Sequence, residues 1–281
     1  MRALLVSNSF ATSMNPVLTQ RITDLLSKNF ELTAKATTRP QEAISFAADA
    51  TRDKYDIVIA FGGDGTANEV INGLMTISSD NRPAFVILPG GNANVLARNL
   101  GYSRDALQAT RELIAVVTTT HPINLGLGHV QATTKEGTDL HRFFAFNAGI
   151  GIDAEVISAM HELRNRGKKV SDFVYARLAM QRIYSWLKQA SGQLNIEGHS
   201  YFFAIVVNLS PWTYISNRAI DPAPEVTAST ALSVFAAQST NVRAFIAVLK
   251  ALALGGRFAD IPSMQTFDNR SEIVIQAAVP M

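Results

Sequence analysis

Two apolar runs that each end in a glycine-rich turn constrain the fold of this chain more than any other feature of its sequence. Residues 55–60 lead into Phe61-Gly62-Gly63-Asp64-Gly65-Thr66, and residues 85–88 lead into Pro89-Gly90-Gly91-Asn92-Ala93-Asn94. An apolar run that stops at glycines and continues with helical periodicity predicts a strand, a tight loop and a helix. Two such units in series predict neighbouring parallel strands with both loops at their carboxyl ends, where open α/β sheets bind ligands.

The first loop has the composition of a phosphate-binding turn. Its glycines let backbone N–H groups approach a ligand, and the helix that follows adds a positive N-terminal end. Asp64 would repel phosphate unless a divalent cation stood between them, and Thr66 supplies a hydroxyl donor. The alternative interpretation is a tight turn with a helix cap. The second glycine loop favours a shared ligand site over two coincident turns.

The two loops together resemble the catalytic domain of the diacylglycerol kinase family, which includes bacterial diacylglycerol kinases and sphingosine-type lipid kinases. The first motif alone is also typical of NAD kinases and phosphofructokinases, so the pair is the more specific signal. The resemblance covers nearly all of the chain. It implies an ATP-dependent lipid kinase that uses Mg²⁺ and transfers the γ-phosphate to a hydroxyl of diacylglycerol, a sphingoid base or a related lipid.

The expected fold is α/β followed by a β-rich part. Strands and helices alternate up to residue 121, which predicts a three-layer nucleotide domain over 1–121, similar to NAD kinase and phosphofructokinase. Short strands predominate in 122–281, which predicts a β-sandwich domain with inserted helices that binds the lipid. The predicted strands there are 123–130, 143–149, 192–196, 201–209, 231–237 and 272–277, and the predicted helices are 160–189 and 242–254.

By resemblance, Asp64 is the expected catalytic residue and holds magnesium through the Mg-nucleotide. The other residues expected to bind the nucleotide lie in the loops after the strands; they are Asn8, Thr12, Thr37, Gly62, Gly63, Gly65, Thr66, Asn68, Glu69, Gly90, Gly91 and Asn92. Thr37 is also expected to cap the helix that follows it.

The chain departs from the family pattern at several positions. The loop from Asn8 to Thr12 keeps the family's asparagine and lacks its proline and glycine, and Asn92 stands where the family usually has threonine. Asn124 replaces a common acidic residue in the strand that opens the second domain. The segment that holds a structural metal in some bacterial members corresponds to 224–231 and lacks the carboxylate, so no metal is expected there.

The family's late Asp-Gly-Glu motif, whose glutamate is the expected general base, would follow residues 273–276, and the sequence stops at Met281. On this interpretation the sequence is either a truncated form or a degenerate member. Loss of a general base slows proton transfer by roughly 10²–10⁴-fold. Two alternatives stay open: a catalytically impaired member that binds nucleotide and lipid, and an NAD kinase, which rests on the first loop alone.

Composition excludes several other classes of protein. The sequence has no cysteine, which excludes disulfides and thiolate metal sites, and its net charge of +2 gives no indication of nucleic-acid binding. No apolar run approaches the length of a membrane span, so a cytoplasmic location is expected. A basic helical region over 161–188 has two interpretations: a solvated basic face over a packed apolar one, which is the ordinary explanation, and peripheral contact with the anionic inner membrane surface.

Overall fold

The computed structural model describes residues 1–8, 15–133, 137–165, 174, 177–178, 181, 194–215, 217–221, 224–227, 230–238, 243, 246–247, 250–251 and 257–277. The chain forms two compact units. The first contains Met1–Val130, His141–Ala145 and Thr213–Arg218, and the second contains Gln131–Leu140, Phe146–Trp212 and Ala219–Met281. The domain boundary expected at 121 and 122 stays a prediction.

The elements alternate between strands and helices in the first part of the chain and are mostly strands later. The strands are β1 (Arg2–Asn8), β2 (Glu31–Thr37), β3 (Ile57–Gly62), β4 (Ala84–Pro89), β5 (Gly128–Thr133), β6 (Asp139–Phe144), β7 (Asn147–Ile150), β8 (Leu194–Ile196), β9 (His199–Tyr201), β10 (Phe203–Val207), β11 (Thr213–Ile215), β12 (Arg218–Ile220), β13 (Leu232–Ala237), β14 (Met264–Arg270) and β15 (Gln276–Ala277). The helices are α1 (Pro16–Ser27), α2 (Glu42–Ala48), α3 (Asp64–Leu74), α4 (Val95–Asn99), α5 (Ala106–Val116) and α6 (Ile152–Asn165), with short 3₁₀ turns at Ser79–Asn81 and Phe258–Asp260.

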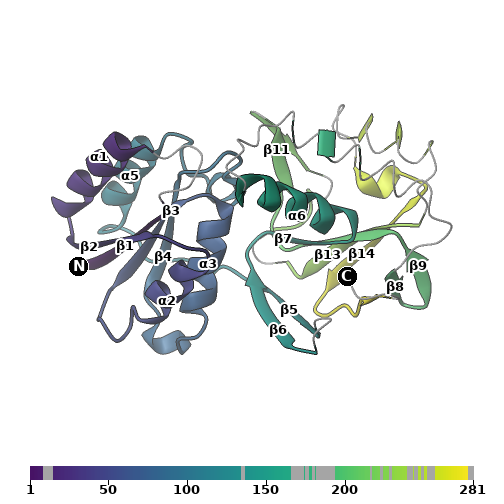
Figure 1. Ribbon diagram of the computed structural model, residues 1–281, viewed down its shortest axis with the longest axis horizontal. Helices are drawn as coiled ribbons and strands as arrows, with labels where there is room; N and C mark the ends of the chain where they lie inside the picture. The colour runs from purple at the N-terminus through teal and green to yellow at the C-terminus, as the bar shows by residue number, and fades with distance from the viewer. Residues whose placement is uncertain are drawn as a thin grey trace. The chain divides into compact units, whose positions relative to one another are not determined.

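A parallel sheet in the order β2-β1-β3-β4 forms the centre of the first unit. Helices α1 and α5 cover one face and α2 and α3 cover the other (Figure 1). Strand residues alternate between these faces: Leu5 and Ile59 pack with α1 and α5, whereas Leu4 and Val58 pack with α2 and α3. The alternation of fully buried side chains on both faces explains why these strands read as continuous apolar runs.

Local signals fix where two of the helices begin and correct one expectation. Asn15 caps α1 by accepting the N–H of Leu18 at 2.7 Å, and Pro16 takes the first helical position. The expected cap at Thr37 is wrong, because α2 begins only at Glu42 and Thr37 is the last residue of β2. The chain between them is held by Glu42 itself, whose carboxylate accepts the N–H of Thr38 at 2.6 Å.

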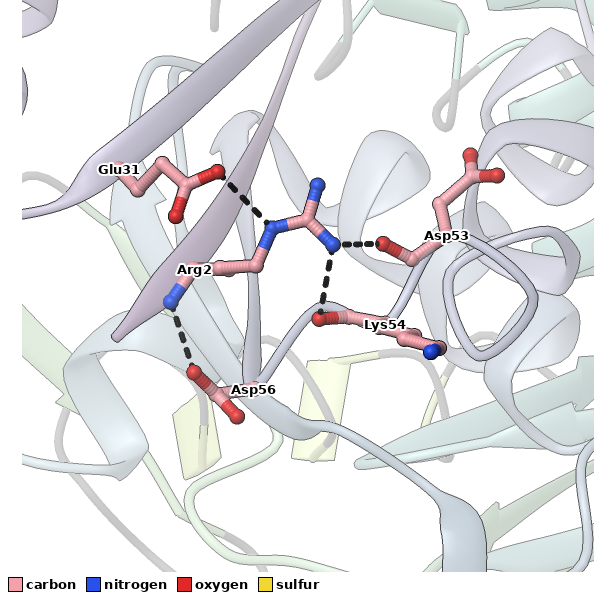
Figure 2. Close-up of polar contacts among 5 residues, drawn as sticks. All are labelled: Arg2, Glu31, Asp53, Lys54 and Asp56. Atoms are coloured by element: carbon pink, nitrogen blue, oxygen red, sulfur yellow. Dashed lines mark hydrogen bonds and ion pairs between the residues drawn. The ribbon is translucent and has the colours of Figure 1, made fainter.

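Arg2 ties three segments together at the amino ends of the strands, the edge opposite the glycine loops (Figure 2). Its backbone N–H donates to the carboxylate of Asp56 at 2.7 Å, and its side-chain Nε donates to the carboxylate of Glu31 at 3.1 Å. Its Nη1 donates to the carbonyl oxygens of Asp53 and Lys54, the latter at 3.4 Å. The guanidinium therefore supplies hydrogen bonds to two backbone carbonyl oxygens in the turn that precedes β3.

We expect Arg2→Met to lower the free energy of unfolding of the first unit by about 2 kcal/mol, because it removes charge-assisted hydrogen bonds to backbone carbonyls. The matched control is Glu31→Gln, which removes only the exposed ion pair and should cost about 0.5 kcal/mol. Urea unfolding followed by circular dichroism measures both. Equal losses from the two variants would place the stabilisation in the ion pair and contradict this assignment.

The second unit is built on an antiparallel sheet in the order β14-β13-β10-β7, with a smaller sheet in the order β15-β8-β9. Its main core includes Ile205, Val207 and Phe235, together with Met264 from the edge strand β14. A parallel sheet with helices followed by antiparallel sheets confirms the predicted fold class.

Several predicted bounds in the second half of the chain need correction. The strand expected from residue 123 begins at Gly128, and the strand expected from 272 is confined to Gln276–Ala277. Strand β14 was not predicted, because its sequence is mostly polar and only Met264 and Phe267 of its side chains are buried. The predicted helices over 160–189 and 242–254 lie largely outside the described residues, and α6 begins earlier, at Ile152.

Candidate functional site

The carboxyl ends of the parallel strands bring the first group of predicted residues together. In the strand register Asn8 lies beside Thr37, and Gly62 lies beside Pro89. Asn8 donates its side-chain N–H to the hydroxyl of Thr66 at 3.1 Å, which joins the end of β1 to the first turn of α3. These residues come from the ends of four strands and from the first turn of α3, and the sheet register makes the strand ends neighbours.

The two glycine loops pack directly against each other. The N–H of Gly90 donates to the carbonyl oxygen of Gly62 at 2.7 Å. A Cβ atom added to Gly91 would lie 2.6 Å from the Cα of Gly63, so the two backbones meet where no side chain fits. The predicted pairing of the loops is therefore present in the structure as a close backbone contact.

Asn94 closes the second loop, and the sequence analysis did not single it out. Its side chain accepts the N–H of Gly91 and donates to the Gly91 carbonyl oxygen, both at 2.8 Å. Its backbone lies in the left-handed region, with φ at 48°, a conformation that asparagine tolerates better than most residues. An asparagine placed three residues after a glycine and directly before a helix is the signal that could have identified it.

Asp64 lies at the start of α3 and points to the N-terminus of α4. Its carboxylate accepts the N–H of Leu96 at 3.0 Å, so it occupies the capping position that no side chain within α4 fills. Burial raises the pKa of the Asp64 carboxyl above its usual value, although hydrogen bonds from the N–H groups of Leu96 and Val95 act in the opposite direction. The carboxylate is thus less solvated than a surface aspartate and is held between the two loops.

Gly65 differs from the other glycines of these loops. A Cβ atom added to it would meet no protein atom within 4 Å, and the residue is exposed in the first turn of α3. An added Cβ on Gly62 would lie 2.6 Å from the Thr66 hydroxyl oxygen, and on Gly63 it would lie 3.3 Å from the Gly91 Cα. Packing accounts for those glycines, whereas the space beside Gly65 is open.

The structure places the remaining predicted residues in different surroundings. Asn68 donates to the carbonyl oxygen of Phe143 at 3.0 Å, and Glu69 accepts the N–H of Gln41 at 3.0 Å, just before α2 begins. Asn92 is exposed at the tip of the second loop. Thr12 lies outside the described residues. Asn68 and Glu69 therefore make contacts that position neighbouring segments.

Asn72 is a further residue that sequence reasoning missed. Its side chain accepts the N–H of Phe143 at 2.9 Å and donates to the Phe143 carbonyl oxygen at 3.0 Å. Together with Asn68, one turn earlier on α3, it holds the end of β6 against the helix that follows the first glycine loop. Two asparagines spaced by four residues on one helix face were the available signal.

Within the ranges that the structure describes, no three or more histidine, aspartate or glutamate side chains form a group able to hold a metal ion. Over the same ranges, none of the helices combines the length and apolar character that crossing a bilayer requires.

Both glycine loops lie in a stretch that is similar to a known protein family. Residues 2–127 match the family model described as the diacylglycerol kinase catalytic domain. A diacylglycerol kinase from Bacillus subtilis is 37% identical over 130 residues, which cover 44% of this chain and 41% of that protein. A diacylglycerol kinase from Staphylococcus saprophyticus is 37% identical over 117 residues, which cover 40% of this chain and 37% of that protein. The sequence matches thus span about two fifths of these relatives.

The likeness of fold extends further along the chain than the likeness of sequence. A crystal structure of a diacylglycerol kinase from Bacillus anthracis superposes with a TM-score of 0.64, covering 98% of this chain and 86% of that one. Sequence identity in that superposition is 20%, so it supports a common fold and nothing finer. The two glycine loops and the family match coincide in the N-terminal part of the chain, where residues 2–127 resemble the diacylglycerol kinase catalytic domain.

Proposed function

We propose that this protein is an ATP-dependent lipid kinase that transfers the γ-phosphate of ATP to a hydroxyl group of diacylglycerol, a sphingoid base or a related lipid. The observation that carries the proposal is the open space beside Gly65, in the first turn of the eleven-residue helix that follows the first glycine loop. Packing explains the neighbouring glycines, so a glycine with free space at this point indicates room for a ligand. Phosphate groups bind readily at such helix starts.

The nucleotide phosphates would lie against the backbone of the two loops. The start of α3 offers N–H groups and a positive helix end, and its N-cap residue Gly63 provides no side-chain acceptor for them. Asn8 and Thr66 border the same edge, and their mutual hydrogen bond fixes the direction of both side chains. The remaining residues proposed to contact the nucleotide are Thr37, Gly62, Gly65, Gly90, Gly91 and Asn92.

The surroundings of Asp64 fit a magnesium ion bound together with a nucleotide. Mg²⁺ is usually held by one or two carboxylates plus substrate phosphates, and Asp64 is a partly buried carboxylate beside the proposed phosphate position. When bound, the ion would neutralise the charge that develops on the transferred phosphoryl group. The chain itself contributes orientation: the N–H of Leu96 holds one carboxylate oxygen of Asp64 in place.

The names of the relatives support a lipid as the acceptor, since those matched over the catalytic domain are diacylglycerol kinases or lipid kinases. We assign the second, β-rich part of the chain to the lipid. A peripheral contact with membranes through the region 161–188 is part of the same proposal, although most of that region lies outside the described residues.

The proposal is tested by measuring transfer of labelled γ-phosphate from ATP to diacylglycerol and to sphingosine in mixed micelles, with magnesium and with excess chelator. We expect a labelled lipid that appears only with magnesium. Equilibrium binding of ATP, measured in parallel, shows whether the nucleotide site forms independently of turnover.

A catalytically impaired nucleotide- and lipid-binding protein is the competing interpretation, favoured by Asn124 and by the absence of a carboxylate at residues 230–231. ATP binding without labelled product from any lipid supports that interpretation and overturns the kinase assignment. Labelled NADP formed from NAD would instead support an NAD kinase, so NAD belongs among the acceptors tested.

A further inference from the structure

Helix α4 is a short element held by polar contacts at both ends. Its five residues span about 7 Å. At its N-terminal end, the N–H of Leu96 donates to the Asp64 carboxylate at 3.0 Å. Its own N-cap, Asn94, makes no side-chain capping bond to it and instead holds Gly91. The orientation of α4 therefore bears directly on how Asp64 is held.

The C-terminal end of α4 is held by a segment that lies more than a hundred residues later in the chain. The guanidinium of Arg98 lies 3.4 Å from the ring centroid of Tyr214, in β11. The Tyr214 hydroxyl donates to the side-chain oxygen of Asn99 at 2.9 Å, and Arg98 donates to the carbonyl oxygen of Asn217 at 3.5 Å. Residues 213–218 belong to the same compact unit as α4, so these contacts are internal to that unit.

The chemistry of this contact favours a fixed geometry. A planar guanidinium stacked on an aromatic ring, with a hydrogen bond from the ring hydroxyl to the adjacent residue, restrains both rotation and sliding of the helix end. Burial and the nearby charge of Arg104 lower the pKa of Arg98, in keeping with a guanidinium packed on a ring and partly removed from solvent. Because α4 is little more than one turn long, displacement of its C-terminal end moves its first turn as well.

We infer that Tyr214 is a positioning residue for Asp64, acting through α4: it fixes the end of the helix whose first turn orients the carboxylate. The expected change in activity rests on the proposed function. The expected change at the Leu96 amide rests on the structure alone. A segment from the β-rich half of the sequence thereby contributes to the geometry of the nucleotide loops.

The test compares Tyr214→Ala, Tyr214→Phe and Arg2→Met in the full chain. For Tyr214→Ala we expect kcat for phosphate transfer to fall about tenfold, as for other residues that orient a metal-binding group, with KM for ATP within about twofold of the parent. Tyr214→Phe keeps the stacked ring and should retain most of kcat. Arg2→Met lowers stability at the far edge of the same sheet and should leave kcat unchanged, which separates positioning from loss of stability.

Hydrogen exchange of the Leu96 amide supplies a readout that needs no activity. We expect its protection to fall in Tyr214→Ala and to persist in Tyr214→Phe and Arg2→Met. Unchanged protection and unchanged kcat in Tyr214→Ala would overturn the inference, as would an equal loss of kcat in Arg2→Met. If the parent transfers no phosphate, the proposed function fails, and the exchange of Leu96 alone decides whether Tyr214 holds α4.

Discussion

Replacing Gly65 with alanine should stabilise the protein and yet weaken nucleotide binding by at least about tenfold. The substitution adds a methyl group where no protein atom lies within 4 Å, so the free protein accepts it without strain. Alanine in the first turn of α3 also loses less backbone entropy on folding than glycine, which is worth about 0.5–1 kcal/mol. The same methyl group would occupy the space that we assign to a phosphate. Thermal unfolding and ATP titration measure the two opposite effects.

Gly73→Ala is the matched control, because it makes the same change in the same helix with the opposite expected outcome. A Cβ atom there would overlap the carbonyl oxygen of Ile44 and lie 2.7 Å from the Cβ of Ala47, where α3 packs on α2. We expect a loss of about 1–3 kcal/mol in stability and unchanged ATP affinity for the folded protein. If Gly65→Ala binds ATP as tightly as the parent, the first loop is only a tight turn and the phosphate assignment is wrong.

The parallel sheet and the pairing of the glycine loops were predictable because both follow from local patterns. Continuous apolar runs such as 57–60 specify strands buried on both faces, and glycines directly after them specify close loops. The contact between Gly63 and Gly91 then follows from adjacent strands ending at one edge. For these features the sequence and the structure report the same physical constraint.

The contacts made by individual polar side chains were not predictable in this way. Asn68 and Asn72 recognise the backbone of Phe143, and Tyr214 contacts Arg98 and Asn99, in each case across about seventy or more residues of chain. No periodicity encodes such pairs, because their partners are set by the path of distant segments. Strand β14 was missed for a related reason: pairing along β13 fixes it, although few of its own side chains are apolar.

Replacing Asp64 with asparagine should reduce phosphate transfer by at least about a hundredfold while making the free protein slightly more stable at neutral pH. The asparagine side-chain oxygen can still accept the N–H of Leu96, so the loop keeps its shape. The pKa of Asp64 is raised in the folded state, so the fold favours the protonated carboxyl. The stability that protonated Asp64 contributes is present at low pH and is lost as pH rises through the folded-state pKa. We expect a melting temperature about 2 °C above the parent near pH 7.5, with the difference vanishing below about pH 4.

Magnesium separates the metal-binding role of Asp64 from its capping role. Added magnesium and ADP should raise the melting temperature of the parent clearly more than that of Asp64→Asn, because only the carboxylate offers the ion a charged ligand. Asp105→Asn is the matched control: Asp105 caps α5 by accepting the N–H of Gln108 at 2.8 Å, and asparagine can keep that bond, so removing this charge, which lies outside the glycine loops, should leave transfer within about twofold. If Asp64→Asn transfers phosphate as fast as the parent, or if magnesium and ADP stabilise both proteins equally, Asp64 is a structural cap and other groups must hold the metal.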